Sequence, residues 1–157
     1  MVHAAQAQKP RRGVRSVRAA LDDLLEMHTG DAGYLDADGF LFLVDRVKDM
    51  IISGGENVYS AAVENVIYQF PGVLECAVIG VPSDRWGESV YAIVVPRAGR
   101  DVDADALLNH CRMHLAGYEC PKSIEIRNDE LPKTGPGKIL KAELRRPYWD
   151  GLSRGIN

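Results

Sequence analysis

The sequence predicts a small α+β domain, in which a short β-hairpin precedes a sheet of roughly three strands flanked by helices. Apolar residues alternate across residues 34–46, as they do in a half-buried hairpin. Two longer apolar runs, 73–81 and 89–96, are rich in β-branched residues, which favours strands. Helical spacing of apolar residues follows Ser60 and Asp103. This order of elements indicates an antiparallel or mixed sheet.

The hairpin is predicted around the sequence Asp-Ala-Asp-Gly at residues 36–39, which is typical of a tight turn. After the turn, Phe40, Phe42 and Val44 alternate with Leu41 and Leu43. The next segment, "MIISGGENVYS", breaks at Gly54-Gly55.

Two helices are predicted from apolar residues that recur every three or four positions. The first carries Val63, Val66, Ile67 and Phe70 and ends at Pro71-Gly72. The second begins after Asp103, a plausible N-cap, and carries Leu107, Leu108, Cys111 and Leu115 on one face.

The two apolar runs are joined by the polar loop "PSDRWGE" and are predicted to be neighbouring strands. The alternating segment "SIEIR", residues 123–127, is predicted as a third strand. A last short helix is expected over residues 139–146, before Pro147.

Length and composition indicate one globular domain: the chain has 157 residues, 46% hydrophobic and 26% charged. It has no apolar run long enough to span a membrane and no secretory signal pattern. The three cysteines, Cys76, Cys111 and Cys120, match no zinc-site spacing, and their odd number argues against a disulfide framework. We therefore expect a cytoplasmic protein.

Charge is unevenly distributed. Residues 1–20 hold five basic residues and no acidic one, whereas all 22 acidic residues follow. The basic start could be a phosphate-binding arm, an organelle-targeting sequence or a poorly ordered leader. An acidic body is a poor general binder of nucleic acid, so no nucleic-acid partner is expected.

Several side chains have both a structural and a functional interpretation. Asp31, in "HTGD", is a typical turn residue, but its carboxylate could accept hydrogen bonds from a ribose diol. Arg46 could belong to a solvated hairpin end or could contact phosphate and ribose oxygens. Gly54 and Gly55 would let a ligand pass close to the backbone.

Two longer motifs carry a resemblance to a known family. The segments "HTGDAGYLDADGFLFLVDRVKDMIISGGENVYSAAVENVI" and "LPKTGPGKILKAELR" resemble the junction and C-terminal lysine motifs of the adenylate-forming (AMP-binding) enzyme superfamily. The likeness runs from about His28 to Arg146. A Walker-type phosphate loop fits less well, because no Ser or Thr follows Lys138 and the preceding glycines are too close.

The resemblance implies roles for four residues. Asp31 would hold the ribose hydroxyls of ATP or AMP, and Arg46 would assist at ribose and phosphate. Lys48 would be the hinge about which the C-terminal domain rotates between adenylation and thioester formation. Lys138 would be the catalytic lysine that reaches the carboxylate and the α-phosphate during adenylation.

The segments "MIISGGENVY", "DRWGESVYAIVVP" and "GYECPK" most resemble fatty- or aryl-acyl-CoA synthetases. By that likeness Gly54, Gly55 and Glu56 would border the pantetheine channel of CoA. Trp86 and Tyr118 would offer faces for the adenine, and Lys122 a cation for the phosphates. The alternative for the two aromatic residues is a place in the core.

Some positions depart from the family pattern. Ser60 and Ala62 stand where Pro and Glu are frequent, and Pro136 replaces a small residue before Gly137 and Lys138. Glu119 and Cys120 stand where many relatives have basic residues, which affects CoA phosphate binding. His110 and His114, one helical turn apart, lack a third metal ligand, and we expect no metal site.

The expected domain organisation follows from the resemblance. Residues 1–27 form a basic leader, 28–48 a linker and hinge with the start of the hairpin, 49–147 the mobile C-terminal domain, and 148–157 a tail. No adenylating domain precedes His28, so we expect this chain alone to be inactive and to need a separate N-terminal domain.

ATP, AMP, CoA and an acyl-adenylate would be ligands of the complete enzyme, with Mg²⁺ accompanying ATP and no cofactor held tightly by this chain. The alternatives are a stand-alone CoA- or nucleotide-binding module, a protein-interaction module and the remnant of a truncated gene.

Overall fold

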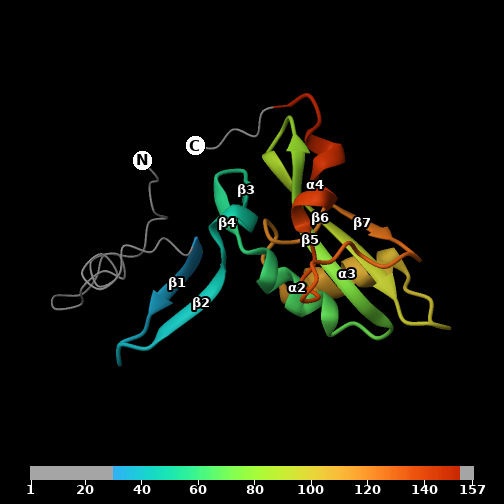
Figure 1. Ribbon diagram of the computed structural model, residues 1–157, viewed down its shortest axis with the longest axis horizontal. Helices are drawn as coiled ribbons and strands as arrows, with labels where there is room; N and C mark the ends of the chain where they lie inside the picture. The colour runs from blue at the N-terminus through green and yellow to red at the C-terminus, as the bar shows by residue number, and fades with distance from the viewer. Residues whose placement is uncertain (1–29, 153–157) are drawn as a thin grey trace. The chain divides into compact units, whose positions relative to one another are not determined.

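The computed structural model of the chain describes residues 30–152 (Figure 1). The predicted leader, residues 1–27, His28 of the first motif and the end of the predicted tail lie outside the described residues. The chain divides into two compact units between Val47 and Lys48. The elements are β1 (Asp31–Leu35), β2 (Leu41–Arg46), the 3₁₀ turn η1 (Val47–Asp49), β3 (Ile51–Ser53), β4 (Glu56–Val58), α2 (Ser60–Tyr68), β5 (Val73–Ser83), β6 (Gly87–Pro96), α3 (Ala104–His114), β7 (Ser123–Ile126) and α4 (Lys141–Trp149).

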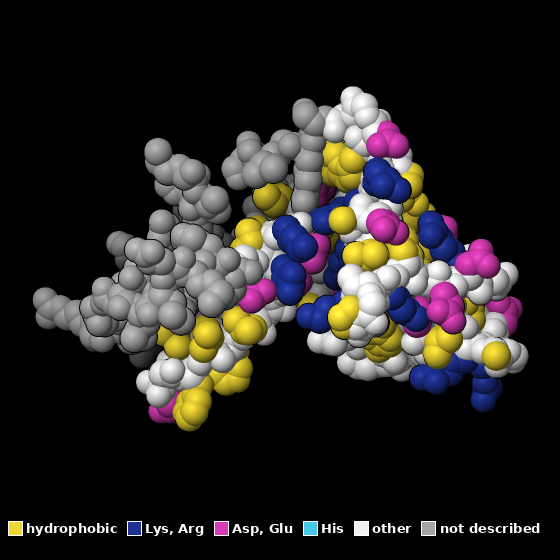
Figure 2. Space-filling view, viewed as in Figure 1, with side chains coloured by type: hydrophobic (Ala, Val, Ile, Leu, Met, Phe, Trp, Pro, Cys, Tyr) yellow, Lys and Arg dark blue, Asp and Glu magenta, His cyan; other side chains and the backbone are white. Residues whose placement is uncertain are grey.

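The first unit contains the predicted hairpin, formed by antiparallel β1 and β2. Its turn forms because the Asp36 carboxylate accepts hydrogen bonds from the backbone N–H of Asp38, at 3.0 Å, and of Phe40, at 2.9 Å. Across the strands, Tyr34 and Phe42 stack with ring centroids 5.2 Å apart. Hydrophobic side chains gather on the hairpin surface, where Phe40 is 67% exposed (Figure 2).

The second unit is built on a five-stranded mixed sheet, in the order β4-β3-β6-β5 with β7 parallel to β6. The predicted α+β class is confirmed, but the sheet has two strands beyond the three expected. They are β3 and β4, which form a hairpin through Gly54 and Gly55, with φ +62° and +86°. The sequence predicts only a break at Gly54-Gly55, although paired glycines with positive φ are typical of tight hairpins. The pair Ser53–Gly87 joins the hairpin to β6.

Helices α2 and α3 cover one face of the sheet. Their buried residues Val63, Ile67, Leu107 and Cys111 pack with Cys76 and Val78 of β5 and with alternate residues of β6. The predicted N-cap is confirmed, because the Asp103 carboxylate accepts from the Ala106 N–H at 2.7 Å.

The other face is covered by α4 and the segment before it. Ala77 and Ile79 of β5 pack there with Leu131 and Leu144. Since successive strand residues point to opposite faces, burial of both faces explains why residues 73–81 are almost continuously apolar.

Helix α4 begins later and extends further than predicted, and it includes Pro147. Proline removes one helical hydrogen bond, so this last turn needs tertiary support. Two contacts provide it: Tyr148 donates its hydroxyl to Glu125 at 3.2 Å, and the Trp149 indole donates to the Gly80 carbonyl at 3.0 Å. In the part of the chain that the structure describes, no helix has the length and apolar content needed to cross a membrane.

Candidate functional site

The predicted catalytic lysine lies on a closed turn between β7 and α4. Residues Lys133 and Ile139 form an antiparallel bridge. Inside it, the Thr134 N–H donates to the Lys138 carbonyl at 2.8 Å, and the Gly137 N–H donates to the Thr134 carbonyl at 2.8 Å. The Lys138 N–H also donates to the Thr134 hydroxyl at 3.2 Å. We call residues 134–138 the lysine turn; its two glycines and Pro136 belong to a closed turn with defined hydrogen bonds.

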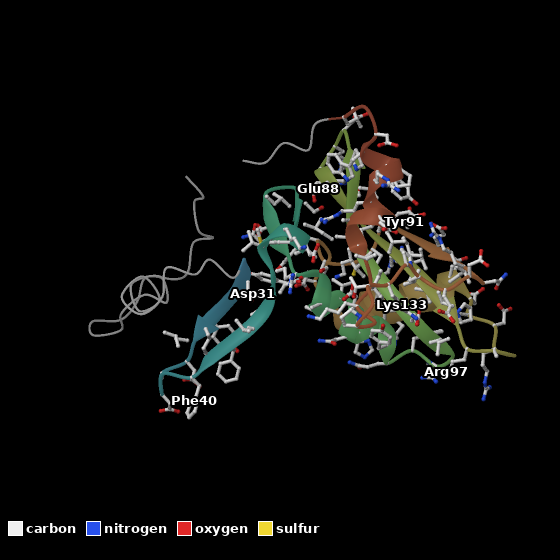
Figure 3. All side chains as sticks on the ribbon, in the orientation of Figure 1. Asp31, Phe40, Glu88, Tyr91, Arg97 and Lys133 are labelled. Atoms are coloured by element: carbon white, nitrogen blue, oxygen red, sulfur yellow. The ribbon has the colours of Figure 1, made fainter. Side chains whose placement is uncertain are left out.

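Ion pairs hold both sides of the lysine turn. Before it, the Lys133 ammonium pairs with Glu75 of β5 and lies 3.5 Å from the exposed Glu130 carboxylate. Figure 3 labels Lys133 on this segment. After it, the Lys141 ammonium lies 2.7 Å from Glu64 of α2. The hydrogen bond that the Lys133 ammonium donates to the Glu75 carboxylate raises the pKa of Lys133.

Lys138 differs from these two flanking lysines. Its residue is exposed, and within residues 30–152 its ammonium has no carboxylate within the 4.0 Å of an ion pair. The segment therefore has two lysines engaged with the domain and one cation that projects from the lysine turn.

Asp31 and Arg46 lie opposite each other on the hairpin. The register pairs them across β1 and β2, and the Arg46 Nε lies 3.7 Å from an Asp31 carboxylate oxygen. The structure therefore brings together the two residues predicted to contact the nucleotide.

Lys48 begins the second unit, at the predicted hinge. Its carbonyl accepts a hydrogen bond from Nη1 of Arg145 on α4, at 2.8 Å, and the neighbouring Asp49 pairs with Nη2 at 3.1 Å. The sequence did not single out Arg145, because 97 positions separate it from Lys48.

The first group of predicted CoA contacts meets at two adjoining turns. The Gly54 N–H donates to the Trp86 carbonyl at 2.8 Å. A Cβ at Gly54 would lie 2.9 Å from Cε3 of the Trp86 indole, so this approach needs glycine.

Trp86 stays 39% exposed, and the guanidinium of Arg85 lies 4.6 Å from the ring centroid. Trp86 is thus a surface residue, and Arg85 is a cation that sequence analysis missed. Glu56 begins β4 immediately after the glycines and is exposed.

The second group lies in the loop between α3 and β7. Tyr118 is 43% exposed, and the Lys122 ammonium donates to the Gly117 carbonyl at 2.9 Å. Glu119 accepts from the Ala116 N–H at 3.0 Å and thereby closes the same loop.

The two groups follow one edge of β6. Gly87 pairs with Ser53 on this edge, and the Val90 carbonyl accepts from the Lys122 N–H at 2.8 Å. Three strand residues, roughly 10 Å, separate these two contacts. The two predicted groups of CoA contacts therefore adjoin the same edge of β6.

The His110 and His114 rings lie together, with centroids 4.4 Å apart. His110 Nε2 contacts the Val66 carbonyl at 3.1 Å, and His114 Nδ1 contacts the His110 carbonyl at 2.8 Å. The His110 ring therefore contacts α2, whereas the exposed His114 ring bonds back to its own helix. No group of three potential metal ligands occurs among residues 30–152.

Comparison with known proteins defines the class. Residues 62–138 match the family model of the AMP-binding enzyme C-terminal domain. The chain therefore belongs to the AMP-binding enzymes and holds their C-terminal domain, as the lysine motif predicted. Within this class it carries the C-terminal domain of the acyl-CoA synthetase family, which agrees with the prediction.

Three relatives illustrate the match. A feruloyl-CoA synthase from Amycolatopsis sp is 58% identical over 121 residues, 77% of this chain and 24% of that protein. The long-chain-fatty-acid–CoA ligase FadD13 of Mycobacterium tuberculosis is 48% identical over 120 residues, 76% of this chain and 24% of the ligase. The structure of ATP-bound MatB from Rhodopseudomonas palustris superposes with a TM-score of 0.72 at 39% identity, over 80% of this chain and 25% of MatB. The chain thus spans about a quarter of the length of the curated relatives it matches.

Proposed function

We propose that the chain is the mobile, lysine-bearing domain of an ATP-dependent, AMP-forming acyl-CoA synthetase, with Lys138 as its catalytic residue. The observation that carries the proposal is the lysine turn: its two flanking lysines are paired with carboxylates of the domain, whereas the exposed Lys138 forms no such pair among residues 30–152. A long cation held on a fixed turn is suited to entering an anionic site on another domain.

The first half-reaction would activate the acid. A carboxylate oxygen attacks the α-phosphorus of ATP, the bond from that phosphorus to the oxygen bridging to the β-phosphate breaks, and pyrophosphate leaves with the electron pair. Because two anions approach, negative charge concentrates at the α-phosphate, where the Lys138 ammonium would stabilise it. Mg²⁺ would enter with ATP rather than through this chain.

The second half-reaction would form the thioester. The CoA sulfur attacks the acyl carbon, the bond to the phosphate oxygen breaks, AMP leaves with the electron pair and the thiol proton passes to solvent. Gly54, Gly55 and Glu56 would border the pantetheine. Trp86 and Tyr118 would contact the adenine, and Lys122 the phosphates. We add Arg85 to these contacts, because its guanidinium lies over the Trp86 ring and would supply a cation for a CoA phosphate. Glu119 and Cys120, which stand where many relatives have basic residues, supply no cation.

The first unit and the hinge complete the proposal. Asp31 would accept hydrogen bonds from the ribose hydroxyls of ATP or AMP, beside Arg46. Lys48 would be the hinge, which is supported by the division of the chain between Val47 and Lys48. Residues 49–147 would then rotate as the mobile domain, with 28–48 as linker, 1–27 as leader and 148–157 as tail.

The proposed partner is a larger adenylating domain that binds the acid and ATP.

We assign the protein to the cytoplasm, since its three cysteines are free and buried, as is usual in a reducing compartment. Nucleic acid is not a proposed ligand, because basic and acidic side chains intermix on the face shown in Figure 2.

A domain exchange tests the proposal. The matching 121-residue segment of the Amycolatopsis feruloyl-CoA synthase would be replaced by this chain's segment. We expect ferulate-dependent ATP–pyrophosphate exchange, and a loss of about 100-fold or more for Lys138→Ala. Arg112→Ala, on the exposed side of α3, is the matched control and should leave the exchange unchanged. A folded chimera whose exchange is insensitive to Lys138→Ala would contradict the assignment.

A second candidate, a stand-alone CoA-binding module, is favoured by one observation. All seven proposed CoA contacts, Arg85 included, lie within the second unit, Lys48–Asn157. Calorimetry with the 157-residue chain would then show CoA binding, and the absence of measurable heat with CoA or AMP would exclude this candidate.

A further inference from the structure

We propose that Glu75 and Glu64 are positioning residues for Lys138, each acting through a lysine that flanks the lysine turn. This inference rests on the proposed function, since it concerns how Lys138 is presented for adenylation. We call the Glu75–Lys133 and Glu64–Lys141 pairs the two clamps.

The first clamp holds the entry to the lysine turn. Glu75, with a side chain 18% exposed, pairs with Lys133 and also accepts from the Leu131 N–H at 3.5 Å. Leu131 is itself 2% exposed in the core under α4. One carboxylate therefore contacts the segment that leads into the turn at two points, the Leu131 backbone N–H and the Lys133 ammonium, and the buried leucine anchors that segment in the core.

The second clamp holds the exit. The Lys141 ammonium lies 2.7 Å from Glu64 and donates to the Ser60 hydroxyl at 2.7 Å. The same Glu64 oxygen accepts from the Val78 N–H of β5 at 2.7 Å. The Lys141 and Glu64 side chains are only 15% and 16% exposed, so solvent screens this contact weakly.

Both clamps therefore lead to β5, the longest strand of the sheet. Glu75 belongs to β5, and Glu64 binds its backbone through Val78. Between the clamps, the backbone of the lysine turn bonds only to itself among the described residues, through Thr134, Gly137 and Lys138. The direction in which Lys138 projects is thus determined at the two ends of the turn.

Control of the direction of Lys138 matters for catalysis because a lysine side chain has many rotamers. Only a few positions of its ammonium would stabilise the transition state. A displacement of about 1 Å can cost a reaction about 100-fold. A clamp that limits the backbone of the turn reduces the volume that the ammonium must search. Loss of a clamp should therefore lower the rate of adenylation without removing any group that touches ATP.

The two half-reactions separate positioning from mere stabilisation of the fold. Under the proposed function, Lys138 acts when the carboxylate attacks the α-phosphate, and it has no part when CoA attacks a supplied acyl-adenylate. A positioning defect should therefore affect only the first half-reaction. General damage to the domain would slow both.

The experiment uses the ferulate-activating chimera and the change Glu75→Gln, which removes the charge but keeps a hydrogen-bonding side chain of similar size. We expect kcat of ATP–pyrophosphate exchange to fall about 10- to 100-fold with KM for ATP within about twofold. Thioester formation from supplied feruloyl-adenylate and CoA should stay within about twofold of the unmodified chimera. Glu64→Gln should behave alike. Glu130→Gln, the same change at a carboxylate 82% exposed, is the matched control and should have no effect.

Rescue provides the second readout. Glu75→Lys combined with Lys133→Glu restores the ion pair with reversed charges but not the bond to the Leu131 N–H, which an ammonium cannot accept. It should therefore recover part of the exchange that either single change removes. Lys133→Gln removes the same ion pair by changing its more exposed partner. If thermal unfolding shows that the Glu75→Gln variant does not fold, the Lys133→Gln variant is measured in its place.

The outcomes distinguish the two proposals. Exchange that is abolished by Lys138→Ala but unaffected by both clamp variants would overturn the positioning role alone. Equal losses in both half-reactions would also overturn it and leave a structural role. Exchange insensitive to Lys138→Ala would overturn the proposed function, and the positioning role with it.

Discussion

The Lys141 ammonium lies 2.7 Å from a Glu64 carboxylate oxygen and so joins the start of α4 to α2. Removing this ammonium would leave the mostly buried Glu64 charge with the Val78 N–H as a remaining partner. We expect Lys141→Met to lower the free energy of unfolding by about 1–3 kcal/mol, measured by urea denaturation of the 157-residue chain. Lys138→Met, at the exposed lysine, should change it by less than about 0.5 kcal/mol. Equal effects of the two substitutions would show that the pair contributes no stability.

The adjoining glycines Gly54 and Gly55 offer a test of the β3–β4 turn. Both have positive φ, but only at Gly54 would a Cβ meet the Trp86 ring, at 2.9 Å. Gly55→Ala should cost about 1 kcal/mol from backbone strain, and Gly54→Ala clearly more, because the indole must also move. Thermal unfolding measures the stability and Trp fluorescence reports the ring. Identical results for the two variants would argue against the packing of Trp86 on Gly54.

Arg85 should contribute to CoA binding through phosphate. In a Trp149→Phe background, Trp86 is the one remaining indole, and its emission should change when CoA binds. We expect Arg85→Ala to weaken CoA binding about three- to tenfold, the size of one charge-assisted contact. Pantetheine, which lacks the phosphates, should bind both forms equally. A variant that loses affinity for both ligands would indicate a packing role for Arg85 instead.

The pair Glu125–Arg127 predicts a dependence of stability on pH. Arg127 Nε lies 2.5 Å from the Glu125 carboxylate, and this hydrogen bond lowers the pKa of Glu125. A lowered pKa in the folded state contributes stability that is present above the ordinary value of about 4.3 and is lost as pH falls through the lowered value. Arg127→Gln should therefore lower Tm at pH 7 by roughly 3 °C, and this difference should shrink between pH 5 and pH 3. A difference that is constant over this range would show that the ion pair is not its origin.

The three cysteines should be unreactive in the folded protein. Burial raises the pKa of Cys76 to about 12 and that of Cys111 to about 11, and it also raises the pKa of Cys120. Because the thiolate is the reactive form, a thiol reagent at pH 8 should label the native chain slowly and the chain in guanidinium rapidly. Rapid labelling of one native thiol would show that its segment opens locally.

Much of the fold followed from local patterns. The α2 and α3 helices, the Asp103 cap and the hairpin β1–β2 were predictable because spacing of apolar residues and turn chemistry act over a few positions. The strands β3 and β4 were not, because each has only three residues and depends on pairing with each other and with β6. The extension of α4 through Pro147 was equally out of reach, since Glu125 and Gly80 support it from distant strands.

The family and the candidate lysine could be predicted from the primary structure, because the motif around Lys138 is a continuous segment whose residue types are readable in order. Which charges meet, in contrast, depends on the folded arrangement. Lys141 bonds to Ser60 across 81 positions, and Arg145 bonds to Lys48 across 97. Nothing in a linear pattern selects among 22 acidic and 19 basic residues, because the choice is made by the packing that brings two strands or helices together. The physical setting of Lys138, exposed between two clamped neighbours, is therefore a property of the folded domain.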